Sequence, residues 1–80
     1  MSEQHLDARR LLCPMPVIRV QEAIAKLVAG DVLHVRCTDP GALYDVPAWC
    51  RVHGHRVVTA EQRDDEVHIC IEVAEQEPRT

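Results

Sequence analysis

Residues 11–18 read Leu-Leu-Cys-Pro-Met-Pro-Val-Ile, so a short apolar run leads into a cysteine and two prolines. Proline is well tolerated in the first turn of a helix, because the backbone amide that it lacks would have no intrahelical partner there. We therefore expect a helix whose first position is Pro14, with Pro16 in its first turn and Cys13 at its N-cap.

The expected position of Cys13 favours a reactive thiol. Unpaired amides and the positive end of the helix dipole stabilise an anion at a helix N-terminus. Cysteines in such places commonly have a pKa below the value of about 8.5 for a free thiol, and the thiolate is the nucleophilic form. The alternative is a buried, inert cysteine, since free cysteine is among the most buried residue types. Position alone leaves both interpretations open.

The residues that follow predict a helix and then a strand. Apolar residues recur at helical spacing until Gly30, which is expected to stop the helix. Residues 31–37 alternate between apolar and polar side chains, the pattern of a half-buried strand. The expected core faces are Val17, Val20, Ile24, Leu27 and Val28 in the helix, and Leu33, Val35 and Cys37 in the strand.

A second helix start follows this strand. Asp39 is the expected N-cap and Pro40 the first helical residue. Pro47 removes an amide partway along, so the helix is expected to kink or restart there. Gly54 is expected to end it.

Residues 6–9 form a weak first strand, and residues 56–61 and 66–73 form two strands around a turn at 64–65. The element order is then strand, helix, strand, helix, strand, strand. Right-handed crossovers place both helices on one face of a single sheet, which predicts a two-layer α/β sandwich. The outer face of the sheet would carry His34, Arg36, His68, Cys70 and Glu72. The apolar face of the last strand is expected to hold Val67, Ile69, Ile71 and Val73.

Length and composition fit one small domain. The chain has 80 residues, and we expect the domain at residues 5–74 with flexible termini at 1–4 and 75–80. A net charge of −4 and only two aromatic residues argue against direct nucleic-acid binding. The longest apolar stretch falls short of the roughly 18 to 20 residues that span a bilayer. The polar start of the chain does not resemble a secretory leader, so we expect a cytoplasmic protein with reduced cysteines.

The spacing of the cysteines disfavours metal and dithiol chemistry. The chain has four cysteines but no Cys-x-x-Cys pair, which counts against a zinc ribbon and against a small thiol reductase. Cys50, His53 and His55 have ligand-like spacing, but a metal site there is the minor interpretation. Cys70 could lie near His34 and His68 on the outer sheet face, where scattered surface histidines are the favoured explanation.

Short motifs spread along nearly the whole chain resemble those of the TusA-like sulfur carriers, also called the SirA-like family. Several motifs in one register are more specific than one Cys-Pro-x-Pro alone. The motifs are Leu6-Asp7, Cys13-Pro14-Met15-Pro16, Gly30, Asp39-Pro40, Asp45-Val46-Pro47, Trp49-Cys50 and Gly54-His55.

The resemblance implies both a fold and a function. The implied fold is a four-stranded mixed sheet in the order 1-2-4-3, with the last strand antiparallel to the others and two helices on one face. The implied function is that of a sulfurtransferase acting as a carrier. Cys13 would accept persulfide sulfur from a cysteine desulfurase or rhodanese and pass it to an acceptor protein, without a cofactor. The end use would be tRNA thiolation, cofactor assembly or sulfur oxidation.

Two residues depart from the usual family pattern. Arg10 stands where the family usually has glycine, and a positive φ there would cost energy for arginine. Met15, between the prolines, is often glutamate in the family, and with Arg19 it is a candidate partner contact. The alternative function is a regulatory or binding module in which Pro14 and Pro16 only cap a helix.

Overall fold

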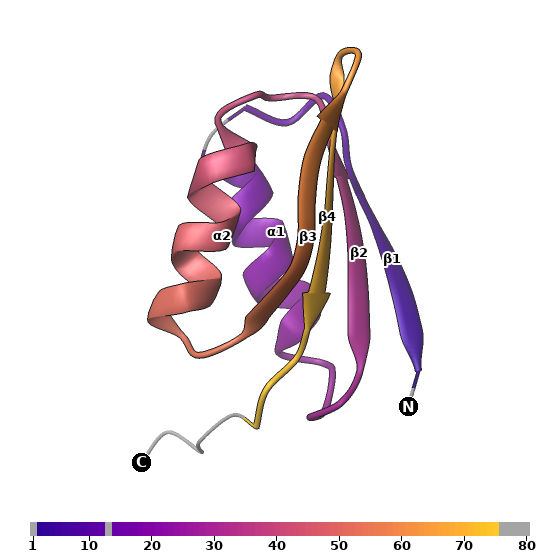
Figure 1. The fold of residues 1–80 in the computed structure, drawn as a ribbon, viewed down its shortest axis with the longest axis vertical. Helices are drawn as coiled ribbons and strands as arrows, with labels where there is room; N and C mark the ends of the chain where they lie inside the picture. Colours follow the sequence, from indigo (N-terminus) through magenta and orange to yellow (C-terminus); the bar gives the residue numbers. More distant parts are fainter. Residues whose placement is uncertain (1, 13, 76–80) are drawn as a thin grey trace.

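A computed structural model describes residues 2–12 and 14–75 of the chain. Figure 1 shows a single sheet with both helices packed on one face, the predicted two-layer α/β sandwich. The elements are β1 (Glu3–Ala8), α1 (Met15–Ile24), β2 (Val32–Cys37), α2 (Ala42–Val52), β3 (Arg56–Arg63) and β4 (Glu66–Glu72).

The sheet has the strand order β1-β2-β4-β3. β1 and β2 are parallel, whereas β4 runs antiparallel to both of its neighbours. This confirms the order and mixed character implied by the family resemblance. β1 begins at Glu3, so it includes part of the N-terminal segment that the sequence predicts as flexible. None of the helices in the described residues is long and apolar enough to cross a membrane.

The core lies between the sheet and the two helices. β2 and β4 turn alternate side chains toward the helices, and these side chains are almost completely buried. Removing apolar surface from water is the dominant favourable term in folding. The predicted core faces of both strands are therefore confirmed. The buried set includes Leu33, Val35 and Cys37 from β2, Val67, Ile69 and Ile71 from β4, and Val20, Ile24, Val46 and Cys50 from the helices.

The start of α1 lies one residue later than predicted. Met15 N donates a hydrogen bond of 2.8 Å to Leu12 O, which closes a tight turn over this stretch. Pro14, with φ −95° and ψ 13°, belongs to that turn and forms the N-cap, while Pro16 lies in the first turn of the helix. Cys13, the predicted N-cap, lies outside the described residues.

The end of α1 also differs from the prediction, because the helix stops at Ile24, well before Gly30. Leu27 N donates to Ile24 O at 2.9 Å, an i→i+3 bond that takes the chain out of the helix in a narrow turn. Leu27 still packs against the core, but Val28 is 68% exposed, so its predicted place in the core face is wrong. Gly30, with φ 94°, instead shapes the turn into β2.

Asp39 closes a turn ahead of α2 and does not cap the helix. Its Oδ1 accepts a hydrogen bond of 3.0 Å from Gly41 N, and Gly41 is the N-cap. A short aspartate side chain commonly bonds its own backbone two residues on, so the same residue type serves a turn as readily as a cap. The predicted helix start at Pro40 is therefore wrong by two residues.

α2 runs without interruption through Pro47, so the predicted restart does not occur. Val46 and Cys50 are fully buried on either side, and their packing holds the helix past the missing amide. α2 ends at Val52 with His53 as its C-cap, and Gly54, the predicted stop, follows with a φ of 81°. His55 N then donates to Cys50 O at 2.8 Å, the outer bond of a Schellman motif.

Candidate functional site

β1 and β2 both lead into a helix at the same end of the sheet. The chain crosses there from the sheet layer to the helix layer twice, and α1 and α2 both begin there (Figure 1). In open α/β sheets, ligands commonly bind outside the carboxyl ends of the strands. Residues 9–14 form the first crossing and carry Cys13, the predicted carrier, which lies outside the described residues.

The residues on either side of Cys13 in the chain, which include the predicted site residues Pro14, Met15 and Pro16, differ in their exposure. Leu12 is 77% exposed and Pro14 is exposed, so both described neighbours of Cys13 face solvent. Met15 is half-buried, whereas Pro16 is buried against the core and anchors the start of α1. The two prolines therefore have different positions, one at the surface and one in the interior.

Arg19 lies on the exposed side of α1. Its guanidinium forms an ion pair of 3.4 Å with Glu22, one turn further along the helix. Exposed pairs of this kind contribute little to stability, so the arginine can exchange this partner for another at low cost.

Few backbone amides in the first turn of α1 are available for an anion. Pro14 and Pro16 have no amide hydrogen, Met15 N donates to Leu12 O, and Ile18 N donates to Pro14 O at 3.2 Å. The first turn also has no acidic side chain. Stabilisation of a thiolate at this end therefore depends more on the field of the helix dipole than on a set of free amides.

Arg10 adopts a left-handed backbone conformation with φ 67°. Positive φ is uncommon for residues other than glycine. Arg10 N donates a hydrogen bond of 2.8 Å to Thr38 Oγ1, which holds this turn against the residue that follows β2. The turn is thus built with arginine in the position where the family usually has glycine.

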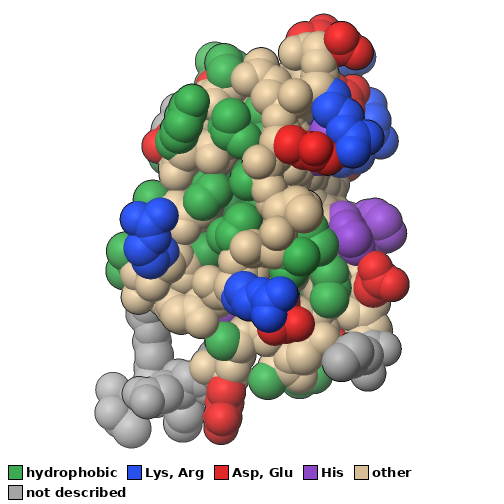
Figure 2. Space-filling model, in the orientation of Figure 1, with side chains coloured by type: hydrophobic (Ala, Val, Ile, Leu, Met, Phe, Trp, Pro, Cys, Tyr) green, Lys and Arg blue, Asp and Glu red, His purple; other side chains and the backbone are tan. Residues whose placement is uncertain are grey.

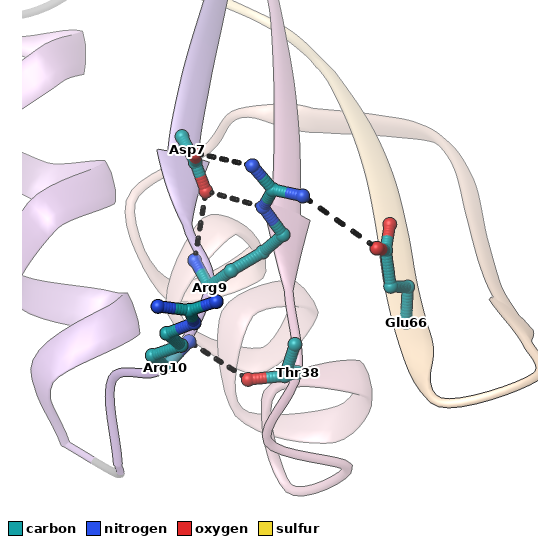
Figure 3. A pocket seen from close by; sticks show the side chains of 5 residues that line it. All are labelled: Asp7, Arg9, Arg10, Thr38 and Glu66. Carbon is teal, nitrogen blue, oxygen red and sulfur yellow. Dashed lines mark hydrogen bonds and ion pairs between the residues drawn. The ribbon is translucent and has the colours of Figure 1, made fainter.

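A polar pocket of about 460 Å³ opens beside this turn, lined by Asp7, Arg9, Arg10, Thr38 and Glu66 (Figure 3). The Asp7 carboxylate accepts hydrogen bonds from Arg9 Nε at 2.9 Å, from its Nη2 at 2.8 Å and from its backbone N at 3.1 Å. The same guanidinium lies 3.8 Å from Glu66. Arg9 therefore bridges the two carboxylates of the pocket.

The pocket carboxylates are held in their charged form. The hydrogen bonds from Arg9 keep the pKa of Asp7 well below its usual range. The pKa of Glu66 is also lowered, first by the hydrogen bond from Arg36 and then by the nearby charges of Arg36, Arg9 and His68. Both groups are anions at neutral pH, and each has an arginine partner.

The three described cysteines are poor nucleophiles. Burial raises the pKa of Cys37 and of Cys50 to about 11. The pKa of Cys70 is raised by burial and by the negative charges of Glu3 and Glu72. None of the three is in a disulfide. Each is therefore a protonated thiol at neutral pH.

The histidines near Cys50 pack in a way that does not resemble a metal site. Trp49 stacks on His53 and on His55, with ring centroids 4.5 and 5.6 Å apart. His55 Nδ1 accepts a hydrogen bond of 3.0 Å from Ala74 N, which occupies one of its ring nitrogens. Within residues 2–12 and 14–75, no group of three or more His, Cys, Asp or Glu side chains is arranged to hold a metal ion.

Thr38 and Glu66 are pocket residues that the sequence did not single out. The pairing of Ala8 with Cys37 in parallel β1 and β2 brings the residues after each strand side by side. The proximity of these residues follows from the strand order and the register. Thr38 could therefore have been identified once the sheet topology was known. Glu66 belongs to β4, and no local sequence motif connects β4 with the turn after β1 that contains Arg9 and Arg10.

Comparison with known proteins identifies the family. Residues 4–73 match the family described as sulfurtransferase TusA. The chain is 33% identical over 69 residues to the sulfur carrier protein TusA of Allochromatium vinosum, covering 86% of this chain and 91% of that protein. It is 42% identical over 64 residues to YrkI of Bacillus subtilis, named as a candidate sulfur carrier, with coverage of 80% and 83%.

A solved structure agrees with this relationship. The crystal structure of a SirA-like protein from Desulfitobacterium hafniense superposes with a TM-score of 0.78 at 26% identity, covering 90% of this chain and 99% of that one. The chain belongs to the TusA family of sulfurtransferases.

Proposed function

We propose that this protein is a sulfur carrier that holds a sulfane sulfur on Cys13 as a persulfide. The observation that carries the proposal is that the other three cysteines are all held as protonated thiols. Cys13 is the cysteine that remains for thiolate chemistry, and its described chain neighbours Leu12 and Pro14 are exposed. The names of the relatives support the same role.

The proposed transfer needs no cofactor and no net oxidation. The Cys13 thiolate attacks the outer sulfur of a donor persulfide, and a new S–S bond forms while the donor's S–S bond breaks. The donor leaves as its thiolate, and the outer sulfur with its proton stays on Cys13. A second exchange of the same kind releases the sulfur to an acceptor thiolate.

The donor we propose is a cysteine desulfurase or a rhodanese, and the exchange takes place in the cytoplasm. Half-buried Met15 and exposed Arg19 extend the surface around the start of α1 that a partner would contact. Transfer onward to an acceptor protein would serve tRNA thiolation, cofactor assembly or sulfur oxidation. Each of these uses requires the same persulfide on Cys13.

Mass spectrometry of the intact protein tests the proposal. After incubation with a desulfurase and cysteine, or with inorganic polysulfide, the wild type should gain one sulfur, about 32 Da. Cys13→Ser should gain none, and Cys70→Ser is the matched control that should be loaded like the wild type. A wild type that takes up no sulfur from either source would instead support a binding module in which the prolines only shape a helix start.

A further inference from the structure

We propose that Arg10 is the docking group for an acidic segment of the sulfur donor, whose carboxylate binds the guanidinium beside the polar pocket. The inference rests on the proposed carrier function and names the chemistry of one of its partners. Four observations support it: the backbone at Arg10, the pairing of the neighbouring charges, the free donor on Thr38 and the exposed apolar residues at the same end of the molecule.

The backbone at Arg10 is strained and is held in place from outside the turn. A left-handed φ of 67° costs free energy for arginine and would cost none for glycine. The hydrogen bond from Arg10 N to Thr38 Oγ1 fixes this conformation. Strain of this kind persists where the surroundings enforce it, and it is concentrated at functional sites. The strained position therefore places a cationic side chain at the pocket, which glycine would not provide.

Among the described residues in or beside the pocket, Arg9 and Arg36 each form an ion pair with a carboxylate, whereas Arg10 forms none. Arg9 is bonded to Asp7 at 2.8 Å, and Arg36 is bonded to Glu66 at 3.0 Å. In the part of the chain that the structure describes, no carboxylate lies within 4 Å of the Arg10 guanidinium. Both carboxylates that line the pocket therefore already have an arginine partner, and the Arg10 guanidinium can bind a further carboxylate.

Thr38 supplies a second donor at the same place. Its Oγ1 accepts from Arg10 N, so its hydroxyl hydrogen remains available for a ligand. Figure 3 shows Thr38 and Arg10 side by side on the rim of the pocket. A guanidinium fork and a neighbouring hydroxyl together match the two oxygens of a carboxylate.

The surroundings favour a protein segment over a small free anion. Leu12, two residues after Arg10, is 77% exposed, and Tyr44 in the first turn of α2 is 74% exposed. Figure 2 shows hydrophobic side chains on the helix side of this end of the molecule. Exposed leucine and tyrosine offer nothing to a sulfate or phosphate ion, whereas aromatic residues and arginine are enriched in protein interfaces.

The first test measures binding of a short polyglutamate peptide by NMR titration at low ionic strength. Arg10→Gly accepts the positive φ and removes the side chain with its guanidinium. Arg51→Ala is the matched control, because it removes the same charge from the last turn of α2, at the other end of the helix. We expect the Thr38 amide to shift in the wild type and affinity to fall about tenfold in Arg10→Gly alone, with Arg10→Lys intermediate.

Two results of this titration would overturn the proposal. Equal weakening in Arg51→Ala would show a response to net charge rather than to this pocket. An equal shift of the Thr38 amide with inorganic sulfate at matched ionic strength would show a general anion site.

The second test compares loading of Cys13 by inorganic polysulfide with loading by a persulfidated donor protein that loads the wild type. Polysulfide should load all variants equally, because it needs no docking. The donor should load Arg10→Gly about tenfold more slowly, and added salt should reduce that difference. Donor loading of Arg10→Gly at the wild-type rate would overturn the docking role and leave the carrier function intact. Failure of polysulfide to label Cys13 would instead contradict the carrier function.

Discussion

Arg10 N donates a hydrogen bond of 2.8 Å to Thr38 Oγ1, and this bond ties the turn after β1 to the residue after β2. Thr38→Val removes the acceptor while keeping the shape of the side chain. We expect the free energy of unfolding to fall by about 1 kcal/mol, the usual net value of one hydrogen bond. Urea denaturation measures the loss. Thr38→Ser keeps the hydroxyl and should match the wild type, and equal stability of Thr38→Val would show that the bond contributes nothing.

The left-handed backbone at position 10 predicts an unusual order of stabilities. Arg10→Gly and Arg10→Ala both remove the guanidinium, but only alanine keeps the steric cost of positive φ. We expect Arg10→Gly to be more stable than Arg10→Ala by about 1 kcal/mol, the reverse of the order in an ordinary strand or helix. Thermal and urea unfolding of the two variants side by side measure this difference. An alanine variant at least as stable as the glycine variant would contradict the strained turn.

The raised pKa values of the buried thiols predict a pattern of alkylation. At pH 7.5 Cys37 and Cys50, with pKa values of about 11, should stay unmodified by iodoacetamide in the folded protein. Cys70, half-buried on the outer sheet face, should react slowly, and Cys13 should react first under the proposed function. Peptide mapping by mass spectrometry gives the order. In urea all four cysteines should become reactive, which controls for the reagent.

The lowered pKa of His55 predicts that the protein loses stability in mild acid. Burial, and secondarily the charge of His53, lower the pKa of His55 below the ordinary value of 6.5. The unfolded chain therefore binds the proton at a higher pH than the folded one. The stabilising contribution is complete above pH 6.5 and is lost as the pH falls from there toward the folded pKa.

Unfolding in urea at several pH values between 5 and 8 tests this dependence on His55. His55→Asn keeps an acceptor for Ala74 N and should flatten the profile. His5→Asn, on the exposed outer sheet face, should leave it unchanged. A wild-type profile that is flat over this range would be inconsistent with a neutral, buried His55.

Asp31 links three segments and should be costly to remove. Its Oδ1 accepts from Ser2 N at 3.2 Å and its Oδ2 from Val28 N at 3.1 Å, and the residue is only 7% exposed. Asp31→Ala leaves both donors without this acceptor, so we expect a loss of about 2 kcal/mol in urea unfolding. Asp31→Asn keeps one acceptor oxygen and should lose less. Asp31→Ala and Asp31→Asn of equal stability would argue against both hydrogen bonds.

The alternation of residues along β2 and β4 was enough to predict the core, because a strand has a fixed period and one face of each is buried. Leu33 and Ile71 illustrate this agreement. The ends of the helices were harder to predict. Pro14 and Asp39 have residue types that suit both a turn and a helix start, and only the hydrogen bonds from Met15 N to Leu12 O and from Gly41 N to Asp39 Oδ1 decide between the two roles.

The candidate site was predicted only in part, for a similar reason. Cys13, Pro14 and Pro16 form a local motif and can be found along the chain. Arg10 could be identified as unusual from its place in the family pattern, but its positive φ is held by Thr38, far away in sequence. Glu66 depends on the register of β4 against β2, which no short motif specifies.

The directions of β1 and β4 have a practical consequence for labelling the protein. β1 begins, and β4 ends, at the end of the sheet opposite the start of α1 (Figure 1). A strand of the length of β1 spans about 20 Å. A dye or a surface linker attached at Ser2 or Glu75, the two ends of the described part of the chain, would therefore start at a distance from the Arg10 turn. Immobilised protein should thus present that turn to a donor in solution.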